Sequence, residues 1–248
     1  MKERPILFSG PMVKAILEDR KSTTRRSVKR SVTDCVCEDL DFIQFEHVNE
    51  PIIRKDGDGN NPYEYKGWLA HHIEYPEEGS IEVRSPYGQP GDRLWVREIC
   101  YIWGQWVENG ITKTGRKKYR FKAEGPNTVV FNPNHPQVAK HRSTRPLNTK
   151  CYWFRPSIHM PRWASRILLE ITDIRVERLQ DITEEDACDE GIKQYENHDF
   201  GLDEPKECMG TSAKLAFMRL WNHINGPASW DANPWVWVVK FKRAVTKP

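Results

Sequence analysis

Residues 91–98 read GDRLWVRE, and this stretch decides the fold class. Gly91 and Asp92 are typical of a tight turn, and residues 93–97 then alternate between polar and apolar side chains. Such alternation is the pattern of a half-buried β-strand. The stretch therefore predicts a strand that begins directly after a turn.

Two further segments predict strands. In the first, Ile167, Leu169 and Ile171 alternate, but after Asp173 the next inward candidates are Ile174 and Val176. This slip of one residue indicates a bulge or bend, which is a common way to curve a sheet. In the second, residues 235–241 alternate, with one face made of Trp235, Trp237, Val239 and Phe241. We expect the strands at 93–98, 166–176 and 235–242 to share one curved sheet or barrel.

Three segments predict helices. Residues 11–19 place Pro11 at the first position, and Val13, Ile16 and Leu17 share one face. Residues 183–190 have Thr183 as a cap, acidic residues in the first turn and Gly191 as a stop. Residues 213–224 form the strongest candidate, with an apolar stripe made of Phe217, Leu220, Trp221 and Ile224.

The stretches between these elements have no regular pattern. Residues 27–90 contain turn signals at 56–60 and 86–88, and residues 104–164 are rich in proline and basic residues. Short strands such as 81–83 are expected there, but both stretches are interpreted as insertions. No linker or repeat divides the chain. We expect a single α+β domain over residues 1–248, a small barrel with flanking helices and long insertions.

Composition limits the setting of the protein. The chain has 248 residues, of which 38% are hydrophobic and 11% aromatic, so it can build a core. No run of about 18 apolar residues is present, and residues 1–5 do not resemble a signal peptide. We therefore expect a cytoplasmic protein without a membrane partner, whose six cysteines are reduced thiols.

Metal and cofactor motifs are weak. Cys35 and Cys37 could join His47, or His71 and His72, at a zinc ion. However, structural zinc pairs usually have two to four residues between the cysteines, and no second cysteine pair follows. No nucleotide-triphosphate motif or dinucleotide fingerprint is present. The sequence therefore predicts no metal and no cofactor.

The positive charge is clustered, although the net charge is only +3. One cluster comprises Arg20, Lys21, Arg25, Arg26, Lys29 and Arg30. A second is interleaved with Tyr119 and Phe121 and comprises Lys113, Arg116, Lys117, Lys118, Arg120 and Lys122. Basic stripes mixed with aromatic residues suit a phosphate backbone with stacked bases. The alternative for the second cluster is solvated charge on ordinary surface loops.

Three motifs, in order, resemble those of the ASCH family. They are the helix end at residues 16–26 (ILEDRKSTTRR), the turn and strand at 91–98, and the acidic helix at 179–191 (LQDITEEDACDEG). The whole chain, including residues 156–163, is similar to the long ASCH proteins of phages and prophages. The resemblance implies a PUA-like barrel and an association with RNA.

The resemblance also implies candidate catalytic residues. Some small bacterial members hydrolyse the acetyl amide of acetylcytidine with a Lys, a Thr and a Glu, which fall on Lys21, Thr24 and Glu190. Two positions depart from the family pattern. Asp19 stands where the family usually has Gly, and Asp adopts a left-handed backbone less readily than Gly. Arg25 replaces an apolar residue of the small members, which suggests a pocket open to longer nucleic acid.

The chemistry of amide hydrolysis is consistent with these residue types. It needs a nucleophile, a base and a group that stabilises the developing charge. Lys21 could act as a base if burial and the neighbouring arginines lower its pKa. Glu190 at a helix C-terminus opposes the helix dipole by about 0.3–1 kcal/mol. We therefore expect a nearby cation, either Lys21 or Arg26.

Other residues are candidates for substrate binding. Arg26 and Arg97 could hold a phosphate, and Trp95 or Trp163 could stack on a base. The full expected set is Arg25, Arg26, Trp95, Arg97, His159, Arg162 and Trp163. The expected partner is single-stranded RNA or DNA, or a modified nucleoside. Two alternatives remain open, namely a non-catalytic reader of RNA or modified DNA, and a ribonuclease that uses Lys21, Glu190 or His159.

Overall fold

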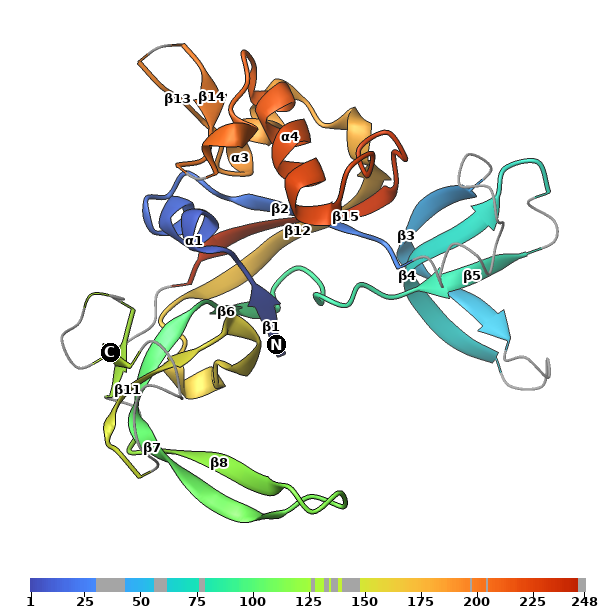
Figure 1. Ribbon diagram of the computed structural model, residues 1–248. Coiled ribbons are helices and arrows are strands. Elements are labelled where there is room, and N and C mark those ends of the chain that lie inside the picture. Colours follow the sequence, from blue (N-terminus) through green and yellow to red (C-terminus); the bar gives the residue numbers. More distant parts are fainter. Residues whose placement is uncertain are drawn as a thin grey trace. The chain divides into compact units, whose positions relative to one another are not determined.

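The computed structural model describes residues 1–29, 43–55, 62–75, 79–125, 128–131, 134, 138–139, 148–196, 198–203 and 205–244 (Figure 1). Arg30, the Cys35 and Cys37 pair and the turn at 56–60 lie outside these residues. Within the described ranges, no helix is long and apolar enough to cross a membrane. Strands predominate, and the few helices include one of thirteen residues, so the fold is α+β as expected.

One five-stranded sheet contains all three strands that the sequence predicted to lie together. Its order is β1-β6-β12-β15-β2, with bounds β1 (Glu3–Leu7), β6 (Arg93–Arg97), β12 (Leu168–Arg178), β15 (Trp235–Arg243) and β2 (Thr23–Ser27). In β6, Leu94 and Val96 are buried while their neighbours are partly exposed, which confirms the alternation. In β12, Ile171 and Ile174 are buried and the two residues between them are exposed, which confirms the phase slip.

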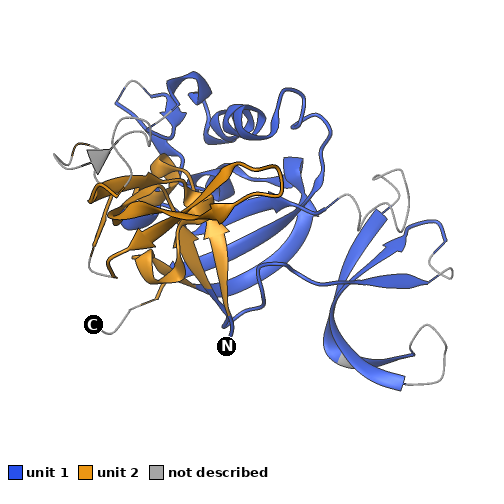
Figure 2. Cartoon of the chain, turned by 60° about the horizontal axis from the view of Figure 1, so that its bottom comes forward, with its two compact units in different colours: residues 1–2, 15–93, 170–242 blue, residues 3–14, 94–169, 243–248 orange. Residues whose placement is uncertain are grey.

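The chain forms two compact units (Figure 2). Unit 1 comprises residues 1–2, 15–93 and 170–242, and unit 2 comprises residues 3–14, 94–169 and 243–248. In unit 1, α3 (Glu184–Asp189) and α4 (Ala213–Asn225) lie on one side of β2 and β15 (Figure 1). The short elements nearby are η6 (Leu179–Asp181), β13 (Lys193–Gln194), β14 (Phe200–Gly201) and η7 (Lys206–Cys208).

The predicted helices form with small corrections. The first is α1 (Gly10–Leu17), which is shorter than expected by two residues at its end. In α3, the Thr183 hydroxyl accepts the Asp186 N–H, as a helix cap does, and Gly191 follows with a φ of 100°. In α4, the apolar stripe is buried at Phe217, Leu220 and Trp221, but Ile224 near the end is 51% exposed.

The last strand differs from the prediction of a half-buried strand. In β15, Val236, Trp237, Val238 and Val239 are all at most 2% exposed, so both faces are covered. One face meets the aromatic side chains of a separate sheet, because Phe45 lies 5.0 Å from Trp235 and Trp68 lies 6.1 Å from Trp237 between ring centroids. A strand that lies between two neighbours and two covering layers buries every side chain.

The two stretches expected to be irregular instead contain long hairpins. In unit 1, a three-stranded antiparallel sheet comprises β3 (Ile43–Lys55), β4 (Pro62–His72) and β5 (Ser80–Val83). In unit 2, a sheet comprises β7 (Cys100–Ile111), β8 (Lys117–Ala123), β9 (Val129–Val130), β10 (Val138–Ala139) and β11 (Cys151–Arg155). Many of the side chains in β3, β4 and β8 are exposed, so the apolar period that predicts a strand is weak.

Unit 2 has its own core. Cys100, Ile102, Met160 and Ala164 are each at most 5% exposed and pack together. Met160 directly follows the 3-10 helix η4 (Ser157–His159), and Ala164 is the last residue of the 3-10 helix η5 (Arg162–Ala164). A second cluster joins Cys151 and Trp153 of β11 to Trp106 of β7. These contacts fix the base of the β7–β8 hairpin.

Candidate functional site

The helix end that carries the first motif aims Lys21 toward the interior of unit 1. After α1, Asp19 adopts a left-handed backbone with a φ of 56°. The N–H groups of Arg20 and Lys21 both donate to the Ala15 carbonyl, at 2.9 and 3.1 Å. Glycine is the usual residue at such a helix end. Asp19 therefore adopts the left-handed conformation for which the ASCH resemblance implied a glycine.

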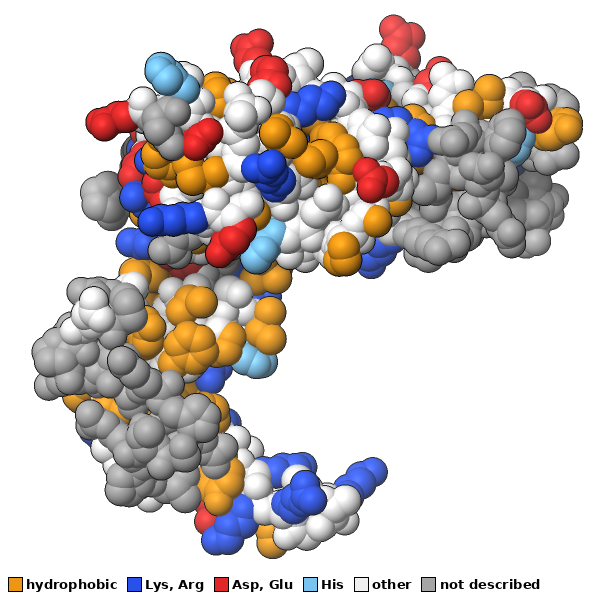
Figure 3. All heavy atoms as spheres, turned by 45° about the horizontal axis from the view of Figure 1, so that its top comes forward, with side chains coloured by type: hydrophobic (Ala, Val, Ile, Leu, Met, Phe, Trp, Pro, Cys, Tyr) orange, Lys and Arg blue, Asp and Glu red, His pale blue; other side chains and the backbone are white. Residues whose placement is uncertain are grey.

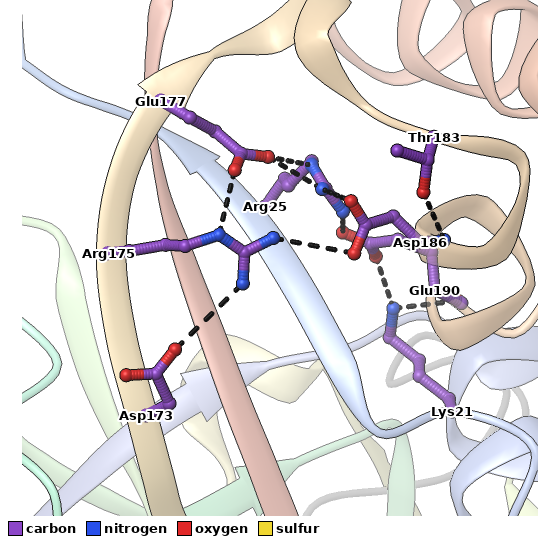
Figure 4. Close-up of polar contacts among 8 residues, drawn as sticks. All are labelled: Lys21, Arg25, Asp173, Arg175, Glu177, Thr183, Asp186 and Glu190. Carbon is purple, nitrogen blue, oxygen red and sulfur yellow. Dashed lines mark hydrogen bonds and ion pairs between the residues drawn. The ribbon is translucent and has the colours of Figure 1, made fainter.

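Lys21 and Glu190 form a buried ion pair (Figure 4). The Lys21 Nζ lies 2.5 Å from Glu190 Oε2 and also donates to the Glu190 carbonyl at 2.8 Å. The two side chains are 0% and 4% exposed, and their backbones form an isolated antiparallel bridge. The cation that the sequence predicted opposite this carboxylate is thus Lys21.

Gly191 allows this close approach. A Cβ at this position would lie 3.0 Å from the Ala15 Cβ and 3.2 Å from the Lys21 Cβ. The positive φ of 100° is likewise unfavourable for residues with a side chain. The glycine that ends α3 therefore also makes room for the backbone of Lys21 beside Glu190.

Arg25 holds a second set of carboxylates next to the pair (Figure 4). Its guanidinium is fully buried and lies 2.6 Å from Glu177, 3.0 Å from Asp186 and 3.6 Å from Glu190. Arg175 binds two of the same acids, at 2.8 Å for Glu177 and 3.4 Å for Asp186. Arg25 was expected to contact substrate, but its charge is compensated by carboxylates of the protein.

The electrostatics of the site follow from burial. Burial lowers the pKa of the Lys21 ammonium below its ordinary value, and this effect outweighs the Glu190 carboxylate, which acts to raise it. Arg26 and Arg25 lower the pKa of Lys21 further by repulsion. Burial raises the pKa of Asp186, but Arg25 and Arg175 outweigh burial and hold that pKa below its ordinary value. Lys21 therefore loses its proton more readily than an exposed lysine does.

Glu190, Arg25 and Thr23 each have one buried polar atom without a hydrogen-bond partner among the described residues. These atoms are Glu190 Oε1, Arg25 Nη1 and Thr23 Oγ1. Arg25 Nη1 and Glu190 Oε1 are 3.6 Å apart, which is too long for a hydrogen bond. Buried polar groups are normally satisfied by protein, water or ligand. Glu190 Oε1 therefore keeps the capacity to accept a hydrogen bond, and Arg25 Nη1 keeps the capacity to donate one.

In β2, the Thr24 side chain lies on the opposite face of the strand from the Arg25 side chain. Arg25 lies opposite Val238 of β15, and Thr24 lies opposite Val239. Successive side chains of a strand point to opposite faces, so Thr24 and Arg26 share one face while Thr23 and Arg25 share the other. Thr24 is only 2% exposed. The structure thus brings Lys21 and Glu190 together, but it directs Thr24 away from the face of Arg25.

The remaining candidate residues lie in unit 2. The guanidinium groups of Arg97 and Arg162 lie 5.4 and 6.0 Å from the Trp95 ring centroid. Arg97 also donates to the carbonyls of Ser157, at 3.0 Å, and of Ile158. Arg162 is paired with Glu3 at 2.8 Å. His159 and Trp163 are exposed on η4 and η5. The expected substrate-binding residues therefore form two groups, one in each unit.

The acidic partners of Arg25 were missed from the sequence. Asp173, Arg175 and Glu177 alternate with Ile174 and Val176 in β12. The apolar pair was interpreted as the inward face, yet the charged face of the same strand carries the network. A run of charges at a spacing of two residues could have indicated this, because such residues share one face of a strand.

Comparisons with known proteins identify no relative of this chain. No protein-family model, no curated protein and no solved structure matches this chain. The resemblance to ASCH proteins therefore stays a prediction from the three motifs.

Proposed function

We propose that this protein recognises a modified cytidine, free or within a nucleic acid, and hydrolyses its acetyl amide at Lys21 and Glu190. The observation that carries the proposal is the buried ion pair between these two residues, in which burial lowers the pKa of the lysine. A lowered pKa makes the neutral form of a lysine more accessible, and the neutral form can serve as a general base. A PUA-like barrel with ASCH-type motifs is part of the same proposal.

The proposed reaction requires two steps. The Thr24 hydroxyl adds to the acetyl carbonyl while its proton passes to neutral Lys21. The cytidine amino group then leaves and takes a proton from Lys21, and water cleaves the acetyl ester to release acetate. Polar atoms without hydrogen-bond partners at Arg25 and Glu190 support binding of the polar edge of a base beside the lysine.

The second candidate is a non-catalytic reader of RNA or modified DNA. The direction of Thr24 favours it, because β2 points this side chain away from the face that carries Arg25. In this case the Lys21–Glu190 pair stabilises the fold, and recognition of nucleic acid takes place without hydrolysis.

The test is conversion of acetylcytidine to cytidine and acetate by purified protein, followed by chromatography. Lys21→Met and Glu190→Gln should abolish turnover, and Thr24→Ala should do the same if Thr24 is the nucleophile. Thr172→Ala is the matched control, since Thr172 is exposed in β12. The wild-type kcat/KM should rise with pH as Lys21 loses its proton.

Three outcomes separate the candidates. Turnover that survives Thr24→Ala but is lost in Lys21→Met protein that circular dichroism shows to be folded supports a catalytic role for the pair and excludes Thr24 as the nucleophile. Folded wild-type protein that binds cytidine analogues without hydrolysis supports the reader. Cleavage of labelled RNA that depends on Lys21 or His159 would instead support a ribonuclease.

A further inference from the structure

The β7–β8 hairpin concentrates positive charge. Its residues 105–122 contain six Lys and Arg and one Glu, whereas the whole chain has a net charge of only +3. Figure 3 shows Lys and Arg side chains gathered at this hairpin, in the lower part of the view. The cations are Lys113, Arg116, Lys117, Lys118, Arg120 and Lys122, and all are exposed.

The strand register sorts these charges onto one face. Arg120 lies opposite Val107, and Lys122 lies opposite Gln105. Lys118 is two residues before Arg120 on the same strand, so it points the same way. This basic face, defined as Lys118, Arg120 and Lys122, therefore has neutral cross-strand neighbours at the two positions of known register.

The opposite face of the hairpin is already occupied. Trp106 lies 5.4 Å from Phe121 and 6.5 Å from Trp153 between ring centroids. The Arg155 guanidinium covers Phe121 at 5.0 Å. Further along, Lys117 is paired with Glu108 at 3.2 Å. Phe121 thus packs on the body of unit 2, and Tyr119, two residues earlier on the same strand, points to the same face, away from Lys118, Arg120 and Lys122.

We infer that the basic face binds the phosphate backbone of a single polynucleotide strand. This inference rests on the proposed recognition of nucleic acid. It adds a binding surface for the backbone of a polymer, which a free nucleoside does not have. With a rise of about 3.4 Å per residue, alternate side chains follow one another at about 7 Å along β8. Three cations on one face of the strand at this spacing fit successive phosphates of one extended strand. A duplex fits less well, because the other face of the ribbon carries Glu108 and packed rings.

The contact is independent of base sequence, since the basic face offers charges and no aromatic platform. Each phosphate that a cation neutralises releases counterions, and for single strands the salt slope is about −0.7 per phosphate. Three contacts therefore give a slope of about −2, which corresponds to an affinity loss of about 20-fold between about 50 and about 200 mM salt.

The experiment measures fluorescence anisotropy of labelled oligouridylate against salt concentration. The triple variant Lys118→Gln, Arg120→Gln and Lys122→Gln should bind more weakly and lose about 2 units of salt slope. The matched control is Lys55→Gln, Lys66→Gln and Lys242→Gln, which removes the same charge from exposed positions outside the hairpin. Circular dichroism checks that both triple variants remain folded.

The inference is overturned if both triple variants lose affinity equally, or if neither does. It is also overturned if a duplex of the same length binds more tightly through the hairpin, or if vesicles of phosphatidylserine bind there and oligouridylate does not. Acetylcytidine hydrolysis reports separately on the proposed function, because a nucleoside has no phosphodiester backbone. The hairpin variants should leave that activity unchanged.

Discussion

Removing one partner of the Lys21–Glu190 pair should destabilise the protein strongly. Lys21→Met keeps most of the side-chain volume but leaves the Glu190 carboxylate buried without its 2.5 Å partner. Breaking a buried pair in this way typically costs about 3–5 kcal/mol. Arg25, at 3.6 Å from the same carboxylate, offsets part of this loss, so we expect the free energy of unfolding to fall by about 3 kcal/mol.

The companion variants identify the cause. Glu190→Gln should cost somewhat less, because the Lys21 ammonium keeps its bond to the Glu190 backbone carbonyl at 2.8 Å. The double variant removes both buried charges, so its loss should fall short of the sum of the single losses by about 2 kcal/mol. For a chain of this size, 3 kcal/mol corresponds to a fall in Tm of about 6–12 °C.

The assay is urea unfolding followed by tryptophan fluorescence, for which Trp221 and Trp237 are buried reporters in unit 1. The control is the exposed pair Lys117 and Glu108, whose side chains are 63% and 48% exposed. Exposed ion pairs contribute little, so Lys117→Met should change the free energy of unfolding far less than Lys21→Met. Equal effects of these two variants, or strictly additive effects of Lys21→Met and Glu190→Gln, would refute the argument that the pair is buried and coupled.

Two further predictions concern the same site. The folded protein holds the pKa of Lys21 below its ordinary value of 10.5. At a pH between the lowered pKa and 10.5, Lys21 is therefore protonated in the unfolded chain and neutral in the folded protein. The contribution of Lys21 to stability should therefore rise with pH through that window, and the difference between wild type and Lys21→Met in urea titrations at several pH values should show it. Gly191→Ala should destabilise by about 1–3 kcal/mol because of its positive φ and its contact with Ala15. Gly10→Ala, where a Cβ meets no atom within 4 Å, should not lower Tm.

Local signals in the sequence were sufficient for the helices and for several strands. Caps and stops act within a few residues, so Thr183 and Gly191 could mark α3 without knowledge of any neighbour. The slip after Asp173 likewise appeared in the burial pattern of β12. The hairpins β3–β4 and β7–β8 escaped prediction, because strands with many exposed side chains have little apolar period to detect.

The composition of the site depended on tertiary structure. Lys21 and Glu190 are 169 residues apart. The motif resemblance placed them in one site, and the unfavourable helix dipole at Glu190 predicted a cation nearby, but neither signal could choose between Lys21 and Arg26. The sequence grouped Arg25 and Arg26 in one basic cluster. The pairing of β2 with β15 then buried Arg25 among carboxylates of β12 and α3 and turned Arg26 to the other face. In the same way, the register of β8 separated Phe121 from Arg120 and Lys122. The chain determines which charges are neighbours along a strand, but the strands and helices packed against each face decide which of those charges are neutralised.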